Sequence, residues 1–349
     1  MNRPLCLLTA LAFTGCASEP GWIDDRFFVR NGDADLYIHA VGDGTSNRFI
    51  LFLHGGPGGG SATYELAPSA PTLHENAVMI YMDQRSSGAS EGTTPTEDLS
   101  LELLTDDVLV VMDVIEELYL KDRAGDPQLW LMGHSWGGML GPSVLFTTDA
   151  PERLAGWIEV NGAHDIPKLH ADSREMLLTH ADERLAGDLD EDAREAWKEI
   201  QDLANKAQVV PKNVDDMLEL NEAAHNATEL IDEVVFENPD GAHAMGWLLE
   251  RQNSSLTNLA SIGPVATVLL EENLERSWSD DYRELTLPTL LIGGAYDFVV
   301  PPTLNDDIQL RIASDRVENV LFEESAHTPM FSEPDAYAAT VLEFIGSTP

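Results

Sequence analysis

The sequence predicts an α/β protein with a mostly parallel, doubly wound sheet and a block of helices inserted near the middle of the chain. Short apolar runs, which suit strands buried on both faces, alternate with segments whose apolar residues recur at helical spacing. Between residues 165 and 281 the strand-like runs thin out, and long stretches rich in Ala, Leu, Glu and Asp replace them. These two observations predict one α/β core that carries a helical insertion.

The first half of the chain supplies most of the predicted strands. Asn31-Gly32 separates the first two runs and is typical of a tight hairpin turn. The segment 98–120 places apolar residues three and four positions apart, which indicates an amphipathic helix, and a shorter helical segment is expected at 62–75. The expected strands of this half lie at 27–30, 35–41, 48–54, 77–82, 127–132 and 154–160.

The second half resumes the strand pattern after the insertion. Strands are expected at 287–292 and 317–322, and a closing helix at 333–345, while 190–206 is typical of the helices of the insertion. We therefore predict that residues 22–164 and 282–349 form the core and that 165–281 form a helical cap.

The first fifteen residues have the order of charges and apolar residues expected of an export signal. A basic start, a compact apolar stretch and a small-residue end predict a signal peptide over residues 1–15. Phe13-Thr14-Gly15-Cys16 resembles a bacterial lipobox, although Phe13 stands where Leu is usual, and Cys16 would then be the lipidated first residue of the mature chain. We expect an exported protein, anchored to a membrane by lipid or periplasmic; a plain signal peptide and an uncleaved N-terminal helix are the alternatives.

The composition excludes several classes of function. The formal net charge of −41 repels phosphate backbones and anionic lipid surfaces, so nucleic-acid binding is not expected. The two cysteines, Cys6 and Cys16, both lie at the N-terminus, so the folded body has no residue for a disulfide, a thiolate metal site or a cysteine nucleophile. No metal or organic cofactor is predicted, and the oligomeric state is left open.

The hexapeptide GHSWGG, at 133–138, directly follows a predicted strand. Gly133 and Gly137 leave room for a sharp strand-to-helix turn that exposes the hydroxyl of Ser135. Asp297 and His327 each follow a later predicted strand, so all three residues are expected at the carboxyl edge of the sheet. An imidazole that takes the serine proton and a carboxylate that orients the imidazole are what a serine nucleophile needs. Singly, Asp297 could be a surface acid and His327 a core histidine; together they predict a catalytic triad.

The glycine-rich stretch HGGPGGG, at 54–60, also follows a predicted strand. Acyl transfer needs two N–H donors for the oxyanion, and we assign these to the amides of Gly56 and Trp136, with Gly55 as the alternative to Gly56. A flexible turn or a phosphate-binding loop would also be rich in glycine, but no Walker lysine accompanies this one.

Together with DQRSSGAS (83–90), GGAYDFVVPP (293–302) and SAHTPMFSEP (325–334), these motifs resemble the prolyl aminopeptidase (proline iminopeptidase) branch of the α/β-hydrolases, over residues 27 to 345. The resemblance implies the α/β-hydrolase fold, Ser135, Asp297 and His327 as the triad, Gly56 and Trp136 as oxyanion donors, and a helical cap over the site. It also implies an acidic cap residue that holds the substrate's amino group, for which Glu250 is the candidate. Ser86 and Ala89 depart from the Gly and Arg that are usual in this branch, which puts the role of that loop in doubt.

The expected function is that of a serine hydrolase that works through an acyl-enzyme on a small peptide, amide or ester. An aminopeptidase that releases N-terminal residues, preferably proline, is the first interpretation. A carboxylesterase or lactonase is the alternative, because the same triad serves amine and alcohol leaving groups. A non-catalytic binding protein on this fold would lack a triad member, and Ser135 stands where dehalogenases and epoxide hydrolases need Asp.

Overall fold

The computed structural model describes residues 21–235 and 253–346. The predicted signal peptide, Cys16 and Glu250 lie outside the described residues. None of the helices within these two ranges has the length and apolar character that a membrane span requires.

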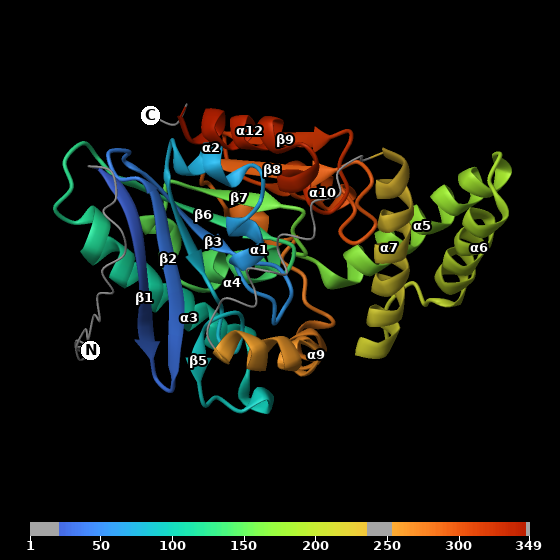
Figure 1. Cartoon of the computed structure of the whole chain (residues 1–349), viewed down its shortest axis with the longest axis horizontal. Helices are drawn as coiled ribbons and strands as arrows, with labels where there is room; N and C mark the ends of the chain where they lie inside the picture. Colours follow the sequence, from blue (N-terminus) through green and yellow to red (C-terminus); the bar gives the residue numbers. More distant parts are fainter. Residues whose placement is uncertain (1–20, 236–252, 347–349) are drawn as a thin grey trace.

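A single twisted sheet forms the centre of the molecule (Figure 1). The strands lie in the order β1-β2-β4-β3-β6-β7-β8-β9, and β5 pairs with β2. Strand β2 pairs antiparallel with β1, β4 and β5, and all pairing from β4 through to β9 is parallel. The strands are β1 (Trp22–Asn31), β2 (Ala34–Asp43), β3 (Arg48–Leu53), β4 (Val78–Met82), β5 (Glu91–Gly92), β6 (Gln128–His134), β7 (Gly156–Val160), β8 (Thr289–Gly294) and β9 (Val317–Phe322).

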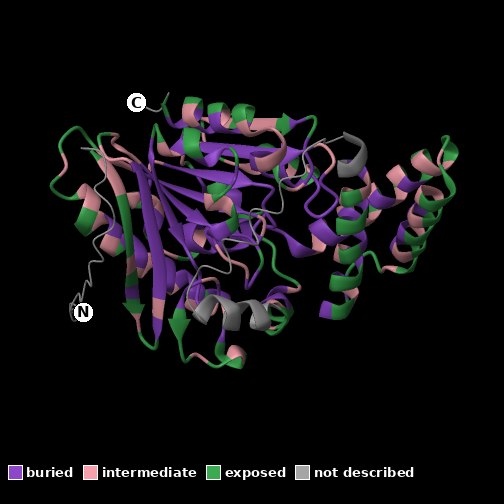
Figure 2. Cartoon of the chain, in the orientation of Figure 1, coloured by how far each residue is buried: buried purple, intermediate pink, exposed green. Residues whose placement is uncertain are grey.

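Helices cover both faces of this sheet. Along β3 the side chains alternate between two hydrophobic clusters, with Phe49 and Leu51 in one and Ile50 and Phe52 in the other. The first cluster packs under α3 (Leu101–Ile115) and α4 (Gly137–Thr147), and the second under α2 (Ala70–His74) and α12 (Pro334–Gly346). The central strands are therefore buried on both sides, as Figure 2 shows.

The predicted fold class, a mostly parallel doubly wound sheet, is confirmed. The hairpin turns at Asn31-Gly32, where Gly32 has a φ of 62°. The helix expected over 98–120 begins at Leu101, because the Ser100 side chain accepts the Leu103 amide, and it ends in a π-helical segment, Glu116–Leu120. Short elements add α1 (Ala62–Glu65), η1 (Thr96–Asp98), η3 (Ala150–Arg153), η4 (Asp281–Glu284), α10 (Thr303–Arg311) and α11 (Pro329–Ser332).

Between β7 and β8 the chain forms a group of helices. These are α5 (Ile166–Ala186), α6 (Glu191–Lys206), α7 (Val214–Val235) and α9 (Asn253–Asn273). The first three pack on one another at one end of the sheet, and α9 lies against α3 and α7 (Figure 1). In α6 the buried residues are spaced three and four apart, and the acidic residues between them face solvent. The assignment of core and cap boundaries at 165 and 281 stays a prediction.

The two ends of this insertion meet at the sheet. Asp165 and Ser277 form an isolated antiparallel bridge, and the Trp278 amide donates to the carbonyl of His164 over 2.9 Å. One Asp165 carboxylate oxygen accepts the Lys168 amide over 2.9 Å, which caps α5. The other accepts the hydroxyls of Ser277 and Ser279. Entry and exit of the insertion are thus held by one side chain.

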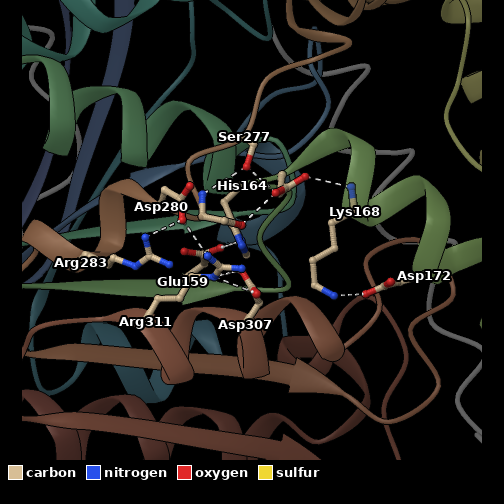
Figure 3. Close-up of polar contacts among 11 residues, drawn as sticks. Glu159, His164, Lys168, Asp172, Ser277, Asp280, Arg283, Asp307 and Arg311 are labelled. Carbon is tan, nitrogen blue, oxygen red and sulfur yellow. Dashed lines mark hydrogen bonds and ion pairs between the residues drawn. The ribbon is translucent and has the colours of Figure 1, made fainter.

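A fully buried carboxylate lies beneath this junction. Glu159 on β7 accepts hydrogen bonds from the Trp157 indole, at 3.0 Å, and from the Tyr282 hydroxyl, and it lies 3.0 Å from Nδ1 of His164. Figure 3 shows this pair together with ion pairs that Asp280 and Asp307 form nearer the surface with the arginines of η4 and α10. Three polar partners thus satisfy the buried carboxyl group of Glu159.

Candidate active site

Ser135 lies in the turn between β6 and α4. Its φ of 53° is in the left-handed region, which a non-glycine residue adopts only where the surroundings enforce it. The backbone is fixed there by three hydrogen bonds: the Ser135 amide donates to Val160 O over 3.1 Å, and its carbonyl accepts from Gly138 at 2.8 Å and Ala163 at 3.0 Å. This strained strand-to-helix turn is the elbow that GHSWGG predicts.

The two glycines of the motif are required by close backbone contacts. A Cβ at Gly133 would lie 2.3 Å from the carbonyl oxygen of Gly137, and a Cβ at Gly137 would lie 2.2 Å from that of Leu53. Neither backbone oxygen can move without displacing the turn itself. The elbow therefore packs directly on β3, the strand that leads into the glycine-rich loop.

Asp297 follows β8 and is fully buried, with both carboxylate oxygens occupied. One oxygen accepts the amides of Val299 and Val300 at 2.9 and 2.8 Å. The other accepts Nδ2 of Asn161 at 2.5 Å and lies 2.8 Å from Nδ1 of His327. Because Asp297 is an acceptor, the proton of this contact sits on Nδ1 of His327, and Nε2 is the ring nitrogen left for the cavity.

One cavity of about 310 Å³ joins four of the predicted site residues. Ser135, His327, Gly56 and Trp136 all line it, and Asp297 lies behind His327. Glu250, predicted to hold an amino group, lies outside the described residues. The structure thus brings the predicted nucleophile, base and oxyanion donors to one place, and their catalytic roles stay predictions.

The glycine-rich loop passes directly beside Ser135. A Cβ on Gly55 would lie 2.8 Å from the Tyr64 hydroxyl oxygen and 3.1 Å from the Cβ of Ser135, so a side chain here would crowd both neighbours. The Gly55 amide donates to the hydroxyl oxygen of Tyr64 over 3.1 Å and is thereby committed. Gly56 follows with a φ of 137°. This geometry favours Gly56 over Gly55 as the oxyanion donor.

A hydrogen-bonded relay, which the sequence did not predict, connects this loop to His327, the predicted base. His134 Nε2 lies 2.8 Å from the carbonyl oxygen of His327 and must donate to it, so Nδ1, at 2.9 Å, accepts from the Tyr64 hydroxyl. Burial lowers the pKa of His134 to about 3, and burial raises the pKa of Tyr64 to about 12. Both groups are therefore neutral at pH 7, which this pattern of donors requires.

A second connection holds the other side of the loop. Gln84 is buried, and its backbone N–H donates to Nε2 of His54 over 3.1 Å. The side-chain Nε2 of Gln84 donates to the carbonyl of His54 over 2.9 Å. The side-chain Oε1 of Gln84 accepts the indole N–H of Trp136 over 3.2 Å. Gln84 thus joins the glycine-rich loop to the residue after Ser135.

The DQRSSGAS loop contains the two positions, Ser86 and Ala89, that depart from the residues usual in the resembling branch. Ser86 has a φ of 59°, a conformation in which glycine carries no strain, so the serine is tolerated at a cost. Ala89 contributes its backbone: its amide donates to Asp83 over 2.6 Å. Arg85 is buried in a two-point ion pair with Asp107 at 2.9 and 2.6 Å, which anchors the loop on α3.

Several functional candidates were missed by the motifs. Asn161 follows β7 just as Asp297 follows β8, so its position past a strand end was the available signal. Asn221 and His225 of α7 line the cavity, but nothing in their sequence context indicates this. Within the described ranges, no three His, Cys, Asp or Glu side chains converge as a metal ion would require.

Fold and site define a class of protein. The sequence profile of the alpha/beta hydrolase family matches residues 50–340, and the chain belongs to this family. The sheet order, the Ser135 elbow and the chain order Ser135, Asp297, His327 agree with that assignment.

The relatives are more specific, and they confirm the resemblance found in the motifs. The chain is 25% identical over 313 residues to a proline iminopeptidase of Saccharolobus solfataricus, covering 86% of this chain and 85% of that protein. It is 23% identical over 319 residues to the proline iminopeptidase of Lactobacillus delbrueckii subsp. bulgaricus, covering 90% and 95%.

Solved structures show the same fold. The crystal structure of a proline iminopeptidase from Mycobacterium smegmatis superposes with a TM-score of 0.65 at 18% identity, covering 93% of this chain and 98% of that one. An esterase from a Rhodococcus species superposes with a TM-score of 0.56 at 16% identity, covering 95% and 100%. Structures of both reaction types therefore share this architecture.

Proposed function

We propose that the protein is a serine hydrolase that works through an acyl-enzyme, with Ser135 as nucleophile, His327 as base and Asp297 as the carboxylate that orients it. The observation that carries the proposal is the shared cavity of Ser135 and His327, with Nδ1 of His327 held 2.8 Å from a fully buried Asp297. With Nδ1 engaged by Asp297, Nε2 is the ring nitrogen left to act on Ser135 in the shared cavity.

The chemistry follows from these positions. Nε2 of His327 takes the Ser135 proton as the oxygen attacks the substrate carbonyl, and Asp297 stabilises the imidazolium that results. The amides of Gly56 and Trp136 stabilise the oxyanion, helped by the N-terminus of α4. The imidazolium then protonates the leaving group, and a water molecule attacks the acyl-enzyme by the same route in reverse.

The substrate class that we propose is a peptide or amide with a free N-terminal residue, preferably proline. Support comes from relatives in four organisms that are named proline iminopeptidase and match 85–90% of this chain. Export, with a lipid on Cys16, belongs to the same proposal and would place the enzyme where external peptides are met.

One observation favours the second candidate, an esterase or lactonase. Among the described residues that line the cavity, none is Asp, Glu, Lys or Arg. A substrate ammonium group therefore gains no counter-charge from this part of the chain, and an uncharged ester would fit the same lining.

Two measurements test the proposal. A fluorophosphonate probe should label the wild type and the control Ser46→Ala, whose serine lies in the β2–β3 turn, but not Ser135→Ala. Labelling that persists in Ser135→Ala, or that fails in a folded wild type, would overturn the triad. Hydrolysis of proline β-naphthylamide without hydrolysis of p-nitrophenyl esters supports the aminopeptidase, and the reverse pattern supports the esterase.

A further inference from the structure

Helix α7 presents one face to the cavity that Ser135 also lines. Met217, Leu218, Asn221 and His225 all line the cavity, and their spacing of one, four and eight residues places them on one side of the helix. This face combines two apolar and two polar side chains, with the polar pair one helical turn apart.

The two polar side chains are available to a ligand. In the parts of the chain that the structure describes, neither the side chain of Asn221 nor the ring of His225 has a hydrogen-bond partner. Asn221 is half-buried and His225 is exposed, so a molecule in the cavity can reach both. The neighbouring walls are apolar, because Ile166, Leu169 and Leu270 close the cavity on the cap side. The pair therefore supplies the hydrogen-bonding groups of this wall.

His225 lies close to the place that the leaving group of the substrate would occupy. Its ring lies 6.5 Å from that of His327, centroid to centroid, with the two planes at 85°. Nδ1 of His327 is held by Asp297, so Nε2 is the atom that protonates the leaving group. That transfer places the leaving atom about 3 Å from Nε2. The atoms that continue the leaving group then lie within reach of α7.

We propose that Asn221 and His225 form a subsite for the leaving group, which selects a peptide over an arylamine or a simple alcohol. The inference rests on the proposed function, because it takes His327 as the proton donor. A neutral imidazole offers one donor and one acceptor, and a carboxamide offers both as well. Those groups match the N–H and C=O of the peptide unit that follows the scissile bond.

The test compares leaving groups on one acyl group. Cleavage of proline β-naphthylamide, whose leaving group carries no further amide, is measured beside cleavage of the tripeptide amide Pro-Ala-Ala-NH2. The variants are Asn221→Leu and His225→Phe, and Glu222→Gln, which changes an exposed residue outside the cavity lining, is the matched control. Arylamide cleavage in the same preparation shows that each variant is folded.

The expected result is a selective loss. Each variant should lower kcat/KM for the tripeptide by about tenfold, the effect of one lost hydrogen bond, and change arylamide cleavage by less than about twofold. An equal loss on both substrates, or no loss on either, would overturn the subsite. A wild type that cleaves neither substrate would instead refute the proposed aminopeptidase function, so the two failures are distinguishable.

Discussion

Asn161→Gly is the substitution that most directly tests how the carboxylate of the proposed triad is positioned. Asn161 is buried, its Nδ2 donates to Asp297 over 2.5 Å, and its φ is 46°. Glycine adopts this φ without strain, so the variant removes the side-chain donor and leaves the backbone turn undisturbed. Asn161→Ala would add backbone strain to the same loss and serves as the comparison.

The size of the effect follows from the contacts of Asp297. Its carboxylate keeps the amides of Val299 and Val300 and the contact with Nδ1 of His327 when the Asn161 donor is lost. A hydrogen bond to a charged group contributes about 1.5–3 kcal/mol. In the proposed mechanism Asp297 stabilises the imidazolium that forms during reaction, so we expect kcat to fall by about 10- to 150-fold, with little change in KM.

The assay is steady-state hydrolysis of the best arylamide or ester, together with the rate of fluorophosphonate labelling. Both rates should fall by the same factor, because both need the activated Ser135. A rise in KM with unchanged kcat, or a change below twofold in a folded variant, would show that Asn161 does not position Asp297.

Three further predictions concern the elbow, the buried charge and the relay. Gly137→Ala should destabilise the fold by about 3 kcal/mol or more in urea unfolding, because its Cβ would lie 2.2 Å from a backbone oxygen. The control Gly263→Ala has open space around its Cβ and should not destabilise the fold. Equal urea midpoints for the two variants would contradict this reasoning. His164→Leu should lower the free energy of unfolding by about 1–3 kcal/mol, since it leaves the buried Glu159 carboxyl group with only Trp157 and Tyr282 as partners. An additive double-mutant cycle with Glu159→Leu would disprove the coupling. His134 binds a proton near pH 6.5 when unfolded but only near pH 3 when folded, so its contribution to stability is complete above about pH 6.5 and is lost as the pH falls toward about 3. His134→Gln should therefore unfold with a free energy that falls less steeply between these pH values, by up to about 1.4 kcal/mol per pH unit, and parallel curves would refute the shift.

Local patterns were enough to predict the core of the fold. The run at 48–54 is apolar at every position but its ends, which indicates a strand buried on both faces, and β3 is such a strand. The amphipathic segment 98–120 was likewise visible, because its spacing depends on residues within the same helix. Its π-helical end was not, since no simple spacing marks one.

The site was predictable in part, for the same reason. Ser135, Asp297 and His327 each follow a strand, and parallel strands end at one edge, so their meeting follows from topology. The relay through Tyr64 depends on contacts between residues 9 and 70 positions apart in sequence, which no local pattern records. The cavity face of α7 depends on how the cap helices pack, which hydrophobic spacing does not determine.

The bridge between Asp165 and Ser277 has a consequence for how this enzyme could diversify. Because the inserted segment leaves and rejoins the sheet at one point, its length and helix packing can change without altering the distance that the core must span. Ser135, Asp297 and His327 all belong to the part of the chain on the other side of this point. Replacing the insertion at this junction by that of another protein would exchange the cavity wall formed by the inserted helices. Ser135, Asp297 and His327 would stay in place.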